Sequence, residues 1–267
     1  MSTILYDVSD GVATITLNKP DKLNALDDGM IEALWAAAYR AAEDQEARVI
    51  VLTGAGRGFC AGADVTGFGG LDPEALITKM QRPFDMNQRP DYQTRHSLFP
   101  AIPKPIIAMI NGPAAGLGLL YALFCDIRFS AEGATMTTAF VRRGLAAEYG
   151  FAWILTKLVG QANALDLLLS ARRFTGLEAE RMGLVNRAVP LKDLANKTYA
   201  YARDMAVNCS PAAMKAVKQQ VYDVPFETLA ESVRTANQMM LTTNASEDFA
   251  EGTRSFLEKR PPKFQPL

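Results

Sequence analysis

Two apolar strands that each run into a glycine-rich turn constrain the fold of this chain more than any other feature. The run "RVIVLTG" at 48–54 is short and rich in β-branched residues, and the loop "GAGRGFCAGADV" at 54–65 continues from it. The run "KPIIAMING" at 104–112 leads into the turn "NGPAAGLG" at 111–118 in the same way. Such runs predict buried strands. The turns can aim backbone N–H groups at one oxygen that gains negative charge, or they can simply let a strand pack tightly against a helix.

The glycine spacing does not match the fingerprints of nucleotide-binding loops. Phe59 and Tyr121 stand where the third glycine of a dinucleotide-binding loop would be required, and the sequence has no P-loop motif. The single histidine, His96, rules out a zinc site built on several histidines. It is also the one residue that a nucleophile–histidine–acid triad could use. Backbone N–H groups and carboxylates are the chemistry that remains, and we expect no metal site.

Composition is that of an ordinary globular protein. With 267 residues, 49% of them hydrophobic, the chain can form one large domain or one domain with a small appendage. A net charge of −1 gives no basic surface for nucleic acid. Cys60, Cys125 and Cys209 fit neither a zinc site nor a disulfide framework, which favours a reducing compartment. We see no signal peptide and no apolar stretch near the roughly 20 residues of a membrane span, and therefore expect a cytoplasmic protein that does not bind membranes.

The order of elements predicts an α/β core followed by helices. Alternating residues predict strands at 4–8 and 12–17, and Asp27 is a suitable N-cap for a helix that ends at about Asp44. A mostly helical excursion is expected at 71–99. Helices dominate after residue 190. Further strands are expected at 48–54, 104–112, 127–130, 135–137 and 184–189.

Several segments, taken in order, resemble the crotonase superfamily, the enoyl-CoA hydratases and isomerases. They are "NKPDKLNAL" at 18–26, "ARVIVLTGAGRGFCAGADV" at 47–65, "INGPAAGLGLLYALFCDIRFS" at 110–130, "RRGLAAEYG" at 142–150, "FTGLEAERMGLVNRAVP" at 174–190 and "FLEKRPPKF" at 256–264. The resemblance covers essentially the whole chain and is weakest at 67–100.

This resemblance implies a crotonase (ClpP-like) fold. Residues 1–195 would form a spiral of ββα units that carries the coenzyme A and oxyanion-hole loops, and residues 196–267 a C-terminal helical region used in trimerisation. The ligand implied is an acyl-CoA thioester, with coenzyme A entering as part of the substrate and no metal or redox cofactor. The expected assembly is a homotrimer or a dimer of trimers.

The resemblance also implies which residues hold the thioester. The backbone N–H groups of Ala63, in "CAGAD", and Leu117, in "AAGLG", would form an oxyanion hole, with Gly116 beside the second donor. Lys22 could reach a phosphate of coenzyme A or be an ordinary surface lysine. Lys259 would meet coenzyme A phosphates on a neighbouring subunit, unless the tail is only a solvated end. The remaining coenzyme A contacts would come from the segments "DKLNAL" and "CAGAD", at Lys22, Leu23, Ala25, Ala61, Gly62 and Asp64.

The position of the acid separates the reactions of this superfamily. Hydratases carry two glutamates, and the corresponding positions here are Leu120 and Phe140. Glu148, in "GLAAEYG", precedes an apolar helix expected at 149–159, where the Δ3,Δ2-enoyl-CoA isomerases carry a single acid. The resemblance therefore implies an enzyme of fatty-acid-type degradation that converts a 3-enoyl-CoA to a 2-enoyl-CoA, with Glu148 moving one proton from C2 to C4 of a dienolate.

Other roles for Glu148 remain open at this stage. It could be the base of an enoyl-CoA hydratase that forms a 3-hydroxyacyl-CoA, or it could only complement a helix dipole in a non-catalytic acyl-CoA-binding protein. An apolar pocket would raise the pKa of Glu148, whereas a helix N-terminus would lower it. Glu132, Glu178 and Asp126 are further acids, and Asp126 better suits a structural role. The segment 67–100 would shape the acyl pocket, so the acyl group is not defined.

Overall fold

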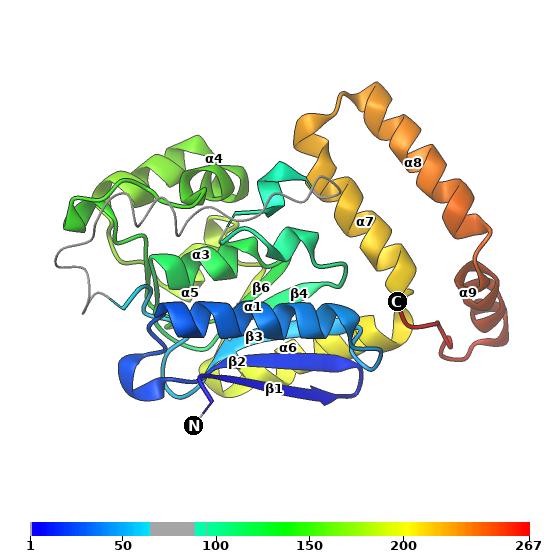
Figure 1. Ribbon diagram of the computed structural model, residues 1–267, viewed down its shortest axis with the longest axis horizontal. Coiled ribbons are helices and arrows are strands. Elements are labelled where there is room, and N and C mark those ends of the chain that lie inside the picture. The colour runs from blue at the N-terminus through cyan, green and yellow to red at the C-terminus, as the bar shows by residue number, and fades with distance from the viewer. Residues whose placement is uncertain (1, 65–88, 95) are drawn as a thin grey trace.

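A six-stranded mixed sheet forms the centre of the structure. Its strands, in order across the sheet, are β1 (Ile4–Ser9), β2 (Val12–Leu17), β3 (Val49–Gly54), β4 (Ile106–Ile110), β6 (Ile127–Ala131) and β8 (Arg187–Val189). β1 and β2 form an antiparallel hairpin, and all other neighbours in the sheet are parallel. The computed structural model describes residues 2–64, 89–94 and 96–267, and Figure 1 shows their arrangement.

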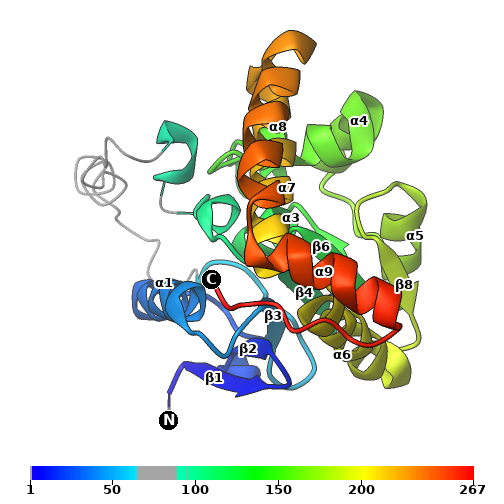
Figure 2. The ribbon, with the colours of Figure 1, turned by 90° about the vertical axis from the view of Figure 1, so that its right-hand side faces the viewer.

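Helices pack on both sides of this sheet. Helix α1 (Asp28–Glu43) packs on β1 and β2, and helix α6 (Leu191–Asn208) packs on β2, β3, β4 and β6 from the other side (Figure 2). Every residue of β3 and β4 is buried, which is why these strands are continuous apolar runs instead of alternating ones. The Asp27 carboxylate accepts a hydrogen bond from Met30 N at 2.9 Å, so α1 begins where the sequence predicts.

A second, shorter ladder follows the carboxyl ends of β3, β4 and β6. It pairs Leu26 with Ala63, Cys60 with Ala114, β5 (Ala114–Ala115) with β7 (Met136–Thr137), and Met136 with Phe174. The chain thus repeats one order of elements twice. Each of β4 and β6 adds a strand to the sheet, the short strand after it (β5 or β7) joins the ladder, and a helix such as α3 (Leu117–Phe124) follows. This repeat is the predicted spiral of ββα units, and the α/β fold class is confirmed.

The last helices extend away from the sheet as a C-terminal arm (Figure 1). They are α7 (Pro211–Asp223), α8 (Leu229–Asn244) and α9 (Glu247–Glu258). Ser210 caps α7, because its hydroxyl accepts a hydrogen bond from Ala213 N at 3.1 Å. The boundary expected between residues 195 and 196 falls within α6, which packs on the sheet. The division into a spiral core and a helical region stays a prediction.

Three elements differ in extent from the prediction by two residues or more. Strand β4 covers Ile106–Ile110 of the expected 104–112. Helix α4 (Phe151–Ser170) begins two residues later than expected and continues through a bend at Gly160, whose φ is +75°. The last strand is confined to Arg187–Val189 instead of 184–189. The residues before it turn back onto helix α5 (Gly176–Arg181), and Leu184 N donates to Ala179 O at 2.8 Å.

The structure describes only part of the helical excursion expected at 71–99. Residues 71–88 and 95 lie outside the described residues, and Pro90–Tyr92 forms a short 3-10 helix. None of the helices in the described parts of the chain combines the length and the apolar character that crossing a membrane requires.

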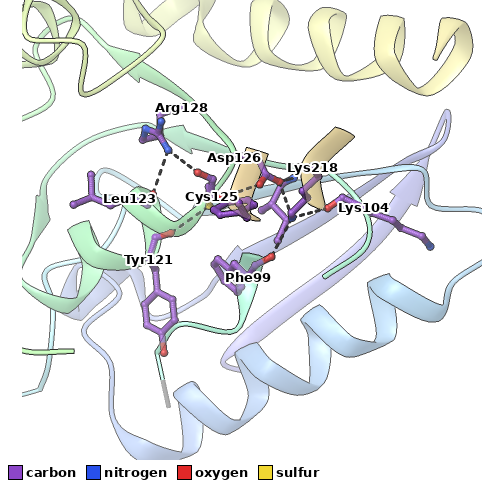
Figure 3. Close-up of polar contacts among 10 residues, drawn as sticks. Phe99, Lys104, Tyr121, Leu123, Cys125, Asp126, Arg128 and Lys218 are labelled. Atoms are coloured by element: carbon purple, nitrogen blue, oxygen red, sulfur yellow. Dashed lines mark hydrogen bonds and ion pairs between the residues drawn. The ribbon is translucent and has the colours of Figure 1, made fainter. Parts of the chain in front are cut away.

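A buried ion pair fastens the C-terminal arm to the sheet (Figure 3). Lys218 Nζ, on α7, lies 2.8 Å from Asp126 Oδ2, and the two side chains are 7% and 16% exposed. Asp126, between α3 and β6, also accepts hydrogen bonds from Ile106 N at 2.7 Å and from the Tyr222 hydroxyl at 3.0 Å. Lys218 donates further to backbone carbonyl oxygens near the sheet. Both charges are thus compensated, and removing one would leave the other buried without its partner.

Replacing Asp126 by Asn is expected to lower the free energy of unfolding by about 3–5 kcal/mol, because the Lys218 ammonium would stay buried without a counter-charge. Urea denaturation followed by circular dichroism measures the change. Asp10→Asn is the matched control, because Asp10 and Arg203 form an exposed pair at 3.5 Å; its effect should stay within about 0.5 kcal/mol. Equal losses in the two variants would show that the buried pair does not fasten the arm.

Candidate active site

The turn after β4 delivers the first backbone donor. Gly116 is the N-cap of α3, with φ +48° and ψ −123°, a conformation that side chains rarely allow. Helix α3 therefore begins at Leu117, whose N–H is among the first of the helix and has no partner within it. This N–H also lies at the positive end of the helix dipole. The sharp turn at Gly116 thus places the predicted donor, the Leu117 N–H, at the start of α3.

The loop after β3 delivers the second donor. Leu26 N donates to Gly62 O at 2.8 Å, and Asp64 N donates to Leu26 O at 2.8 Å. Because these two bonds flank Ala63, the Ala63 N–H points to the opposite side of the ladder. Within the described residues, the N–H of Ala63 donates no hydrogen bond. It is therefore available to a ligand.

Close backbone packing brings the two turns together. Cys60 N donates to Pro113 O at 3.0 Å, and Ala115 N donates to Cys60 O at 3.0 Å. Gly62 has φ +96°, and a Cβ built on it would lie 2.6 Å from Ala115 O and 3.6 Å from Leu117 N. The residue next to Ala63 thus touches the start of α3. The two turns that carry the predicted donors therefore adjoin, and a shared oxyanion hole needs this closeness.

Asn24 organises the loop that carries Ala63, a role that the sequence analysis missed. Its side chain is fully buried, and Nδ2 donates to the carbonyl oxygens of Ala55, Gly58 and Phe59 at 2.9–3.1 Å. Its Oδ1 accepts a hydrogen bond from Lys19 N at 2.9 Å. One amide therefore ties two segments of the site together. The sequence offered one signal for this role, because Asn24 is a polar residue between the apolar Leu23 and Ala25 of "DKLNAL".

The residues predicted to bind coenzyme A lie on two paired segments. Leu23 O accepts a hydrogen bond from Ala61 N at 2.9 Å. The exposed Lys22 ammonium lies 2.9 Å from Asp64 Oδ2, and this hydrogen bond together with the carboxylate charge raises the pKa of Lys22. The structure thereby brings together six of the predicted residues, Lys22, Leu23, Ala25, Ala61, Gly62 and Asp64.

Lys259 lies apart from this group. It is the left-handed C-cap of α9, and its side chain is exposed. Figures 1 and 2 show α9 at the opposite end of the molecule from the segment that precedes α1. A single chain therefore does not place Lys259 beside Lys22.

Glu148 lies on a loop between Phe140 and helix α4. The rings of Phe140 and Phe151 meet edge to face, with centroids 5.1 Å apart, and close this loop. Tyr149 and Gly150 are both left-handed, with φ +53° and +78°, so the chain turns sharply after Glu148. The helix predicted from residue 149 accordingly starts at Phe151. Glu148 therefore stands ahead of the first helical turn.

Burial dominates the electrostatics of Glu148. Its side chain is half-buried, and desolvation raises its pKa above the ordinary value. The helix dipole acts mainly within the first turn, which Glu148 precedes. Of the two opposing effects, burial is the one that acts on this carboxyl in the structure. A carboxyl with a raised pKa is suited to exchanging protons near neutral pH.

The other acids have structural partners or lie elsewhere. Asp126 is held by Lys218 (Figure 3), and it also accepts hydrogen bonds from the Tyr222 hydroxyl and from Ile106 N. Glu178, in the first turn of α5, pairs with Arg172 at 2.6 Å.

The two positions where hydratases carry glutamates lie in the apolar core. Leu120 is fully buried within α3, and Phe140 packs on Phe151. Within the described residues, side chains of His, Cys, Asp and Glu form no group of three that could hold a metal ion.

Two hollows on the described surface are separate from this site. One, of about 800 Å³, lies between α7 and α9, and one of about 370 Å³ lies between α1 and α7. Among the described residues that line them, Ala63, Leu117 and Glu148 do not occur. The segment 67–100, expected to shape the acyl pocket, lies largely outside the described residues.

A ββα spiral whose two glycine turns present adjoining N–H groups defines an α/β protein of the crotonase fold. A family model described as enoyl-CoA hydratase/isomerase matches residues 7–266. The chain is 38% identical to a probable enoyl-CoA hydratase of Rhodobacter capsulatus over 262 residues, which are 98% of this chain and 97% of that protein. It is 32% identical to the 1,2-epoxyphenylacetyl-CoA isomerase of Escherichia coli over 264 residues, 99% of this chain and 98% of that one.

A solved structure agrees with these matches. The crystal structure of a probable enoyl-CoA hydratase/isomerase from Mycobacterium abscessus has a TM-score of 0.87 at 30% identity, with 100% of each chain covered. The chain belongs to the enoyl-CoA hydratase/isomerase family, and its membership of the crotonase superfamily is confirmed.

Gly62→Ala is expected to abolish the oxyanion geometry, because the new Cβ would collide with Ala115 O and force the two turns apart. Acetoacetyl-CoA is a suitable probe, since its enolate absorbs in the near ultraviolet and an oxyanion hole stabilises that enolate. We expect the variant to lose enolate stabilisation by about 10²–10³-fold.

Gly133→Ala is the matched control for this test. A Cβ at Gly133 meets nothing within 4 Å, so this variant should bind the enolate as the original chain does. Retained enolate absorption in the folded Gly62 variant would contradict the assignment of Ala63 and Leu117.

Proposed function

We propose that this protein is a Δ3,Δ2-enoyl-CoA isomerase of fatty-acid-type degradation that uses Glu148 as its single acid–base group. The observation that carries the proposal is that the Glu148 carboxyl is half-buried with a raised pKa, whereas Leu120 and Phe140 are apolar. A two-glutamate hydratase would need its acids at the positions of Leu120 and Phe140. A 1,3-proton shift needs one carboxylate, whereas hydration normally needs a base for water and an acid for carbon.

The chemistry follows from these groups. The Glu148 carboxylate removes the C2 proton of a 3-enoyl-CoA, and the electron pair moves into the thioester carbonyl. The N–H groups of Ala63 and Leu117 stabilise the oxygen of the resulting dienolate. The protonated Glu148 returns the proton to C4, which leaves the double bond between C2 and C3. Atoms and charge balance, and no external reductant, oxidant or water is consumed. We therefore keep the prediction that the reaction needs no cofactor beyond the coenzyme A of its substrate.

Coenzyme A is proposed to lie along the paired segments 22–25 and 61–64. The support is the side-by-side placement of these segments next to Ala63. The Lys22 side chain is 60% exposed, so its ammonium is accessible to a phosphate of coenzyme A beside Asp64. Lys259 could join only from another subunit.

Trimerisation through the C-terminal arm is a further part of the proposal. Each residue of α8 keeps at least partial exposure. The arm also exposes large apolar side chains, namely Val217, Val221, Leu229, Val233, Met240, Leu241, Phe249, Phe256 and Leu257. Such a surface is typical of an interface. Sedimentation of the full chain should give three or six times the monomer mass. A cytoplasmic location stays a prediction.

Hydration is the second candidate, because several relatives are named probable enoyl-CoA hydratases. In that reaction Glu148 would activate water for addition to C3 of a 2-enoyl-CoA. The two reactions start from different substrates, so two assays on one preparation separate them.

Glu148→Gln is expected to lower kcat for conversion of a 3-enoyl-CoA to its conjugated isomer by about 10²–10⁴-fold or more, because Gln cannot accept the C2 proton. Absorbance of the conjugated thioester follows the reaction. A parallel assay offers the 2-enoyl-CoA and detects the 3-hydroxy product. Hydration that depends on Glu148, without isomerisation, would replace our proposal by the hydratase. Acyl-CoA binding without turnover in either assay would identify a binding protein.

The difference in stability between the original chain and the Glu148→Gln variant should depend on pH in a defined way. Because the folded-state pKa of Glu148 is raised, the folded protein binds its proton more tightly than the unfolded chain does. The carboxylate therefore costs stability once the pH exceeds the raised pKa, and this cost vanishes below the ordinary pKa of the group. Glu148→Gln should be more stable than the original chain at neutral pH and equal to it in acid. Thermal unfolding at both pH values measures this, and a less stable Gln variant at neutral pH would contradict it.

A further inference from the structure

The only histidine of the chain is buried within an aromatic cluster. His96 is 2% exposed, and its Nδ1 lies 2.7 Å from the Tyr121 hydroxyl. Its ring also packs against the Tyr149 ring, with centroids 4.2 Å apart and planes at 66°. A hydrogen bond on one edge and a ring on another leave the imidazole little freedom to rotate. The mechanism above assigns it no role.

Each partner of His96 belongs to one half of the candidate active site. Tyr121 lies on α3, four residues after Leu117, and therefore on the same face of that helix. It is 1% exposed, and Figure 3 shows its hydroxyl pointing away from the Asp126–Lys218 pair. Tyr149 directly follows Glu148. His96 thus lies between the helix that carries an oxyanion donor and the residue that adjoins the acid.

Tyr149 needs such support because of its backbone. Its φ of +53° is unusual for a residue with a large side chain and is energetically unfavourable. A conformation of this kind persists only where surrounding contacts hold it. The ring contact with His96 is one such contact. The turn at Tyr149 in turn determines where the Glu148 side chain leaves the backbone.

We propose that His96 is a positioning residue, which links Tyr121 on the oxyanion helix to Tyr149 and so holds the Glu148 carboxyl at a fixed place relative to the oxyanion donors. The inference rests on the proposed function of Glu148. His96 acts through Tyr149, so it is not itself a catalytic residue. The hydrogen bond to Tyr121 selects one ring orientation whichever of the two groups donates the proton.

This role predicts a specific kinetic pattern. The proposed role of His96 is to place the acid and not to bind coenzyme A, so losing the His96–Tyr121 bond should leave KM within about twofold. A misplacement of about 1 Å at the acid lowers kcat by about 10- to 100-fold. Glu148 would also become more exposed, and the acid limb of the pH–rate profile would move to lower pH, because burial is what raises its pKa.

The test compares Tyr121→Phe, His96→Leu and His96→Asn in the full chain with a 3-enoyl-CoA. Tyr121→Phe removes only the hydroxyl, and His96→Asn keeps a polar atom near the place of Nδ1. We expect the Phe and Leu variants to show the loss in kcat and the shifted acid limb, and Asn to recover much of the loss. Tyr6→Phe is the matched control, because it removes a hydroxyl bonded to Asp44 at 2.8 Å, away from the site, and should keep the original kcat.

Glu148→Gln, assayed in parallel, separates the two possible failures. If it loses activity while Tyr121→Phe and His96→Leu keep full kcat, the positioning role is wrong and the isomerase proposal stands. If it keeps full activity, the proposed function fails and the positioning role fails with it. Loss of kcat in Tyr6→Phe equal to that in Tyr121→Phe would mean that general destabilisation explains the result, which also overturns the role.

A spectroscopic measurement needs no turnover and covers variants that fold poorly. Because His96 is the only histidine, the imidazole nitrogen signals of untagged, ¹⁵N-histidine-labelled protein belong to this residue alone. Tyr121→Phe should move the Nδ1 signal, and Glu148→Gln should move the ring signals through Tyr149, whereas Gly133→Ala should not. Unchanged signals in both of the first two variants would show that the cluster does not connect α3 with Glu148.

Discussion

The close approach of two backbone turns is the constraint on which the rest of this structure depends. A Cβ on Gly112 would lie 2.1 Å from Arg57 O, and one on Gly118 would lie 2.3 Å from Cys60 O. Backbone therefore packs directly on backbone where the chain leaves β3 and β4. This contact allows the short ladder to form and brings the turn that carries Ala63 next to the start of α3 at Leu117. The glycines serve packing and the candidate chemistry at once.

The proposed acid, Glu148, lies in a different kind of structure. Glu148 stands on a loop closed by the Phe140–Phe151 ring contact and followed by two left-handed residues. Such a loop can keep a carboxyl half-buried, and desolvation then raises its pKa. The oxyanion donors rest on rigid backbone, whereas the position of the acid depends on side-chain contacts around Tyr149. A small change in that packing should therefore affect the proton transfer before it affects the binding of coenzyme A.

Local signals in the sequence predicted the parts of the fold that depend on neighbouring residues. The N-caps at Asp27 and Ser210 and the apolar runs of β3 and β4 appear where expected. The start of α4 was predicted two residues early, because the left-handed turn at Tyr149 comes from packing and has no local signature. Asn24 was missed for a similar reason, since its acceptors lie more than 30 residues away.

The sequence by itself determined the α/β order of elements and the glycine turns, because each is written in residue type and spacing, and its segments carried the resemblance to the family. Only the tertiary structure decided how these parts act on one another. It placed Gly62 against Leu117 and put α9, whose C-cap is Lys259, at the other end of the molecule from the segment before α1. It also half-buried the Glu148 carboxyl, which raises its pKa. Distances between remote segments and the solvent around a carboxyl arise from packing, which no single stretch of sequence contains.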